Sequence, residues 1–169
     1  MASVQIGPQA YAPEVVLALA RRQRNWLVWI VILSVVNTIL VFARANVTFV
    51  IGLGVTQLAD SFAVVARERA SGPIVAVLTA VGIAIDLVTL GLYLLLWWLS
   101  GRGSVAAYVT AIVFYALDAL IMLAFHEWFG AAFHAYVLFH LVSGYKFVKA
   151  HREAVSALAA PEVPVGTGS

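Results

Sequence analysis

The sequence contains no cysteine. This absence excludes disulfides, thiolate metal sites, iron–sulfur clusters and cysteine nucleophiles, and it leaves the redox compartment undetermined. Charge is also scarce, because only 11% of the 169 residues are charged, against roughly 25% in an ordinary soluble domain. The net charge of +2 is too small and too scattered to favour a nucleic acid as partner.

Apolar residues, in contrast, make up 63% of the chain. A soluble domain of this size could not bury so much apolar surface, so the composition predicts an all-α, multi-pass integral membrane protein that contacts the lipid bilayer. A helix needs about 20 residues to cross the hydrocarbon core. Five apolar segments come close to or exceed that length, and they run over residues 26–42, 47–66, 74–99, 105–125 and 129–148.

These segments predict one compact bundle of about five transmembrane helices over residues 26–150. Residues 1–25 are expected to form a tail and a short interfacial helix, because apolar residues there precede a basic cluster that favours anionic headgroups. Residues 151–169 are small and include Pro and Gly, so we expect them to be a disordered tail.

The orientation in the membrane is poorly determined by the sequence. Five spans joined by tight hairpins place the two termini on opposite sides, and Lys and Arg then divide equally between the two sides. The first helix usually decides orientation, which favours a cytoplasmic N-terminus. A re-entrant segment or dual insertion remains an alternative.

Four ionisable side chains fall at similar depths in the predicted bundle: Asp60, Asp86, Asp118 and His134. Each acid follows a stripe of small or polar residues at helical spacing, which is typical of a face turned toward other helices. A carboxylate facing lipid would cost several kcal/mol. Asn37 on the first segment and Gln57, one turn before Asp60, extend this layer.

The layer supports two functions of different classes. Burial and mutual repulsion favour a protonated or cation-bound state of clustered carboxyl groups, so the first function is the handling of protons, cations or a small polar ligand. The second is that of a non-catalytic subunit or scaffold, in which protonated Asp side chains join helices and the partners are other membrane subunits or further copies of the chain. We rank the first slightly ahead, although small size and short loops favour the second.

The remaining polar residues predict less. His126 and Glu127 fall in the hairpin HEWFG, where they can reach headgroups and water, and His140 is expected to be a hydrogen-bonded core histidine. Carboxylates and imidazoles suit a divalent metal without identifying it, and a haem held by two histidines would need one on another segment. The sequence therefore assigns no metal or cofactor. An enzyme ranks third, because no nucleophile elbow or phosphate loop is present.

Overall fold

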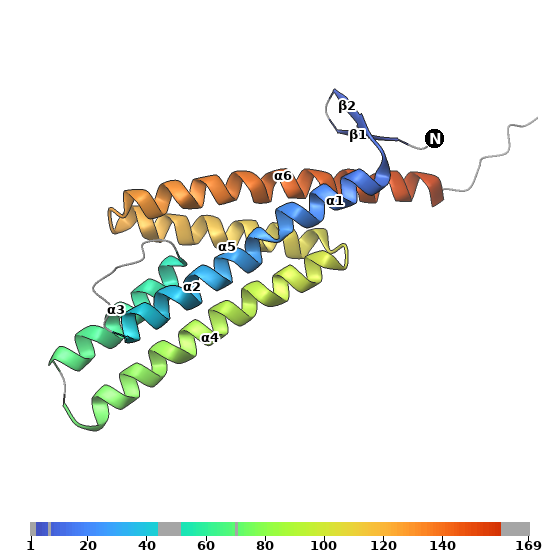
Figure 1. Cartoon of the computed structure of the whole chain (residues 1–169). Coiled ribbons are helices and arrows are strands. Elements are labelled where there is room, and N and C mark those ends of the chain that lie inside the picture. The colour runs from blue at the N-terminus through green and yellow to red at the C-terminus, as the bar shows by residue number, and fades with distance from the viewer. Residues whose placement is uncertain (1–2, 7, 44–51, 70, 160–169) are drawn as a thin grey trace, which may run out of the picture.

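The computed structural model describes residues 3–6, 8–43, 52–69 and 71–159. A short antiparallel hairpin of β1 (Val4–Ile6) and β2 (Gln9–Tyr11) comes first. The helices that follow are α1 (Pro13–Arg24), α2 (Trp26–Phe42), α3 (Gly54–Arg69), α4 (Pro73–Gly101), α5 (Val105–Ala124) and α6 (Trp128–Ala159). Only Asn25 separates α1 from α2, and the two follow one path (Figure 1), so the fold is a bundle of five helical rods.

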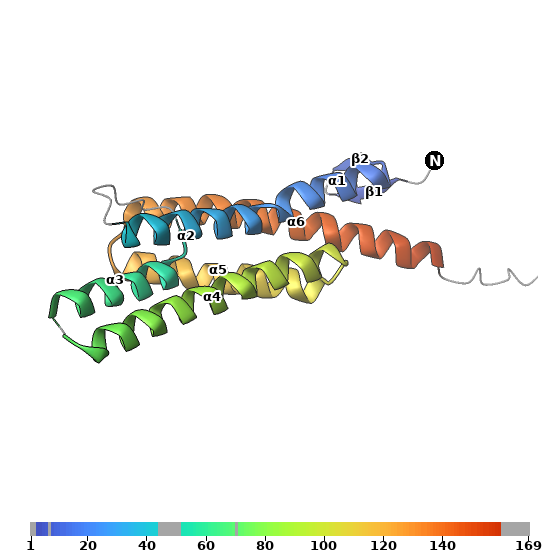
Figure 2. The ribbon, with the colours of Figure 1, turned by 60° about the horizontal axis from the view of Figure 1, so that its bottom comes forward.

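The rods are arranged so that the N-terminal hairpin and the end of α6 lie at the same end of the bundle (Figure 1). Antiparallel neighbours α5 and α6 lie side by side, and α1 packs along the C-terminal part of α6 in both views (Figure 2). The N-terminal hairpin also rests on α6, where the Tyr11 and Phe147 rings meet edge to face with centroids 6.4 Å apart. Val4–Ile6 and Gln9–Tyr11 therefore form strands that pack on α6 rather than a loose tail.

Three helical stretches are long and apolar enough to cross a membrane: Pro13–Phe42, Pro73–Gly101 and Val105–Ala124. Their outer faces are apolar, as Leu87 (66% exposed) and Val88 (73% exposed) on α4 illustrate. The interior holds an apolar core together with buried Asp, Asn, Ser, Thr and His side chains. Apolar outer faces of this extent are unusual in a soluble protein, and they agree with the predicted multi-pass helical membrane protein.

The prediction of five spans holds only in part, and the second segment is the exception. Of residues 47–66, positions 47–51 lie outside the described residues, and α3 begins only at Gly54. With 16 residues and several charges, α3 is not among the stretches suited to crossing a membrane. The last predicted segment lies inside α6, which is long enough but interrupted by polar side chains.

The direction of α3 is also unexpected. Its start lies at the middle of α2, where the Leu53 amide donates to the Ser34 hydroxyl over 2.9 Å. One turn further along α2, Thr38 meets Asp60. At the end of both helices, the Arg67 guanidinium lies 4.6 Å from the centre of the Phe42 ring. α2 and α3 therefore run in parallel, so the hairpin predicted between the first two spans is wrong.

The C-terminal boundary also differs from the expected one. α6 continues to Ala159, so residues 151–159 are helical rather than part of a disordered tail. The rest of that predicted tail, residues 160–169, lies outside the described residues. Contact with α1 along this part of α6 gives the extension a packing partner that a reading of local composition does not reveal.

Candidate functional site

The first buried polar cluster joins Asp118 of α5 to His134 of α6. The imidazole Nε2 lies 2.8 Å from Asp118 Oδ2, and Nδ1 lies 2.7 Å from the Gly130 carbonyl oxygen. His134 is 0% exposed, and its ring stacks on Tyr115 with centroids 4.5 Å apart. Tyr115 precedes Asp118 by one helical turn, which places both side chains on the same face of α5.

Both ring nitrogens of His134 have an oxygen partner, and Asp118 Oδ2 also accepts the Gly54 amide over 2.7 Å. One proton lies in the contact between His134 Nε2 and Asp118 Oδ2, and the pair as a whole carries no net charge whichever atom holds it.

Asp118 also caps the start of α3. Its two carboxylate oxygens accept the amides of Gly54 (2.7 Å) and Val55 (2.9 Å). The first amides of a helix have no partner within the helix, and in a bundle interior leaving them unpaired is costly. Gly54 permits the approach, because a Cβ there would lie 3.3 Å from the Asp118 carbonyl oxygen. Asp118 thus connects three helices through filled hydrogen bonds.

The second cluster contains Asp60 of α3 and Asp86 of α4. The Thr38 hydroxyl donates to Asp60 Oδ2 over 3.0 Å. Asp86, only 4% exposed, interacts with the carboxyl group of Asp60 on the neighbouring helix. Among the described residues, neither oxygen of Asp86 receives a hydrogen bond from a protein donor. A proton held between the two acids would supply the missing donor, since a protonated carboxyl group donates and a carboxylate accepts.

Small residues bring these two helices together. A Cβ added to Gly82 of α4 would lie 3.3 Å from the Ala59 carbonyl oxygen and 3.7 Å from Ala63 Cβ. Close approach through Gly and Ala is common between membrane helices. Because Gly82 precedes Asp86 by four residues and Ala59 is adjacent to Asp60, this contact sets the acids opposite one another.

The sequence-predicted layer residues are thus distributed between two clusters, Asp118 with His134 and Asp60 with Asp86. Asn37 is buried on α2, one turn after Ser34. Gln57 lies one turn before Asp60 and lines a cavity of about 300 Å³ together with Glu127. Sequence reasoning did not pick out Thr38 as a partner of the acids, although it lies on the polar face of the first segment.

The other candidate residues lie apart from the two clusters. His126 adopts a left-handed backbone (φ 61°) in the α5–α6 connection, and its ring meets Trp128 edge to face. Glu127 is exposed beside it. His140 Nδ1 lies 2.9 Å from Gln23 Oε1, and its ring stacks on Trp26 with centroids 5.2 Å apart. These contacts of His140 agree with the expectation that it is a hydrogen-bonded histidine packed between helices.

Within residues 3–6, 8–43, 52–69 and 71–159, no group of three or more His, Asp or Glu side chains is arranged to hold a metal ion. No protein-family model, curated protein or solved structure matches the chain.

Proposed function

We propose that this multi-pass membrane protein binds and releases a proton at the acid pair Asp60–Asp86. One observation carries the proposal: two buried carboxyl groups interact on helices that meet closely at Gly82 and Ala59, and both Asp86 oxygens lack a protein donor among the described residues. Intramembrane acids of this kind are commonly part of proton or ion pathways. The two carboxyl groups are therefore buried near each other, and the oxygens of Asp86 still need a hydrogen-bond donor.

A single proton resolves the conflict between the two acids. Two ionised carboxylates so close together repel each other strongly in a medium of low dielectric constant. One shared proton removes one negative charge and forms a hydrogen bond between the groups, as in other coupled carboxyl pairs. A monovalent cation could replace it, and among the described residues its oxygen ligands would come from the two carboxyl groups and the Thr38 hydroxyl. This small set of oxygens favours the proton.

The second function, a scaffold or subunit of a membrane complex, draws support from the other cluster. Asp118 and His134 fill each other's hydrogen-bonding capacity and that of the start of α3, which leaves no evident position for a ligand. Polar groups arranged in this way join helices. We therefore assign the Asp118–His134 pair to assembly of the bundle and the Asp60–Asp86 pair to proton binding.

The test compares wild type with Asp86→Asn by thermal unfolding in neutral detergent, over a range of pH and with Na⁺, K⁺ or Mg²⁺ added. As pH rises, wild type should lose stability, because loss of the shared proton leaves two like charges buried. Asn at position 86 can donate to Asp60 permanently and cannot release a proton, so the variant should respond much less to pH. Glu127→Gln removes an exposed acid outside the pair and should behave like wild type.

Superimposable pH curves for wild type and Asp86→Asn would contradict proton binding and leave the scaffold function. If stability instead rises with one added cation, and only while both acids are present, the pair binds that cation in place of the proton.

A further inference from the structure

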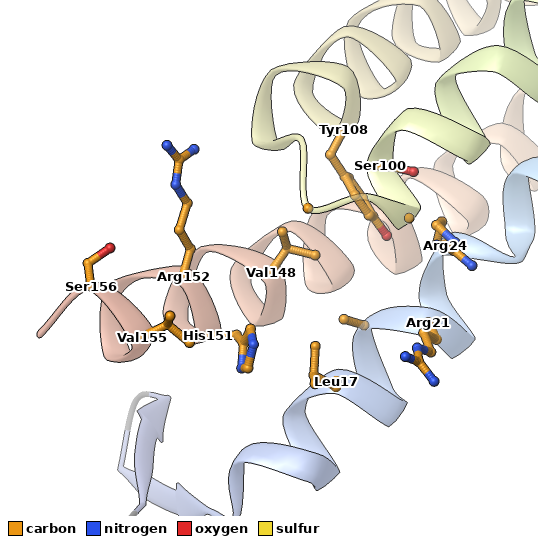
Figure 3. Close-up of a pocket in the computed structure, with 13 residues that line it drawn as sticks. Leu17, Arg21, Arg24, Ser100, Tyr108, Val148, His151, Arg152, Val155 and Ser156 are labelled. Carbon is orange, nitrogen blue, oxygen red and sulfur yellow. The ribbon is translucent and has the colours of Figure 1, made fainter. Parts of the chain in front are cut away.

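A second polar region lies far from the acid pair, at the end of the bundle where the N-terminal hairpin and the end of α6 are found. There α1, the end of α4, the start of α5 and the C-terminal part of α6 enclose a cavity of about 350 Å³ (Figure 3). Its polar wall contains Arg21, Arg24, Tyr108, His151 and Arg152. Within the described part of the chain, no Asp or Glu lines it.

Several donors in this wall have no protein partner among the described residues. The Tyr108 hydroxyl is unpartnered although the side chain is 0% exposed, and Arg24 Nε and His151 Nδ1 are buried without an acceptor. Figure 3 shows these three side chains around the space between α1 and α6. Guanidinium groups only donate, and Tyr and His can donate as well, so the cavity requires an acceptor.

Two glycines permit this arrangement. A Cβ at Gly101 would overlap the guanidinium of Arg24, and a Cβ at Gly144 would overlap the hydroxyl of Tyr108. The Arg24 guanidinium is also held over the Trp97 ring, 5.0 Å from its centre. Both donors are thus held in place by packing before any ligand binds, and such preorganisation lowers the cost of binding.

The apolar part of the lining indicates which kind of anion fits. Leu17 of α1 and Val148 and Val155 of α6 lie among the basic residues of the same helices. An oxyanion satisfies arginines through charge-assisted hydrogen bonds, and an attached acyl chain would match the apolar side chains. Basic pockets between membrane helices recognise lipid headgroups in this manner. We propose that the cavity binds the phosphate group of an anionic phospholipid.

The experiment measures the affinity of the delipidated full chain, in non-ionic detergent, for a short-chain phosphatidylglycerol by ligand-induced thermal stabilisation. Phosphatidylglycerol should bind at least tenfold more tightly than phosphatidylcholine, whose ammonium group opposes the arginines. Inorganic phosphate, which lacks an acyl chain, should bind more weakly than phosphatidylglycerol. Equal affinity for the two lipids, or for free phosphate and phosphatidylglycerol, would overturn the proposal.

Two variants locate the site. Tyr108→Phe removes only the unpartnered hydroxyl and should weaken phosphatidylglycerol binding about tenfold, the effect of one hydrogen bond to a charged group. Without lipid, the same variant should be at least as stable as wild type, because no protein hydrogen bond is lost. Gly101→Ala should also weaken binding about tenfold, since it displaces the Arg24 guanidinium without changing the net charge.

Arg22→Gln provides the matched control, because Arg22 belongs to the same basic cluster but does not line the cavity. Its affinity for phosphatidylglycerol should stay within about twofold of wild type at moderate ionic strength, where distant surface charges are screened. A loss in Arg22→Gln as large as that in Gly101→Ala, or unchanged binding in Tyr108→Phe, would show general attraction to a basic surface and contradict a defined site.

Discussion

Asp118 and Asp86 are both buried carboxyl groups, and they differ in the number of donors around them. Asp118 accepts from two backbone amides and pairs with His134. Asp86 faces another acid and receives no donor from the described residues. The sequence placed both at similar depths because depth follows from position along a helix. It could not separate their roles, because these depend on which side chains the packing brings opposite each acid.

The same substitution should therefore have different effects at the two acids. Asp118→Asn removes the carboxyl partner of His134 Nε2 and offers only one acceptor oxygen to the two α3 amides. We expect a loss of about 3–5 kcal/mol, the usual result of removing one partner of a buried, hydrogen-bonded pair. Asp86→Asn should lose less than about 1 kcal/mol at low pH, because Asn can donate to Asp60. Reversible unfolding in detergent measures both, and equal losses would contradict the assignment of roles.

At the scale of helices, the sequence predicted some boundaries well and one badly. Residues 26–42 coincide with α2, and Pro73 and Ser104 begin α4 and α5 much as their capping chemistry predicts. The prediction of one continuous helix over residues 47–66 was wrong, because α3 begins only at Gly54. The residues around Gly52 and Gly54 are apolar, so no local signal in the sequence marks the start of a helix there. The buried start of α3 is stabilised by Asp118 and Ser34, which are distant in sequence and cannot be identified by local propensity.

The end of α5 offers a test of backbone strain. The amides of His126 and Glu127 donate to the carbonyls of Leu123 (3.1 Å) and Met122 (2.9 Å), a pattern that usually has Gly at the left-handed position. His126 holds that position with φ 61°. His126→Gly should therefore stabilise the protein by about 1 kcal/mol.

His126→Ala is the control, because it removes the imidazole and keeps the Cβ that causes the strain. Thermal unfolding should rank the Gly variant above wild type and the Ala variant close to wild type. Equal gains in both variants would attribute the effect to the imidazole rather than to the backbone.

At the scale of the molecule, the parallel course of α2 and α3 changes the expected topology. In this topology α3 enters the membrane and leaves it on the same side. Four elements then cross the membrane, namely α1–α2, α4, α5 and α6. An even number of crossings places both termini on the same side. Of the nine described Lys and Arg residues, seven then lie at that end: Arg21, Arg22, Arg24, Arg102, Lys146, Lys149 and Arg152. Only Arg67 and Arg69 lie at the other. The equal division of charges under five spans thus becomes a clear bias, and the positive-inside rule then predicts that both termini are cytoplasmic.

Cysteine labelling can test this topology, because the natural chain contains no cysteine. In intact cells, a membrane-impermeant thiol reagent should label Ser71→Cys, between α3 and α4. It should leave Ser3→Cys and Ser156→Cys unlabelled until the membrane is opened. If only one of the two terminal positions is labelled in intact cells, the chain crosses the membrane an odd number of times. That result would contradict the parallel arrangement of α2 and α3 in the membrane.

The central claim is that the Asp60–Asp86 pair holds one exchangeable proton. Infrared spectroscopy of the protein in lipid tests it most directly, because a protonated carboxyl group has a C=O stretching band that a carboxylate lacks. Above about pH 6, where exposed Asp and Glu are ionised, the wild-type spectrum should still contain such a band, and the band should disappear reversibly as pH rises further. Asp86→Asn and Asp60→Asn should each lack the band in this pH range, while Glu127→Gln should retain it. A band that persists above about pH 6 in both pair variants, or its absence from wild type throughout this range, would contradict the account.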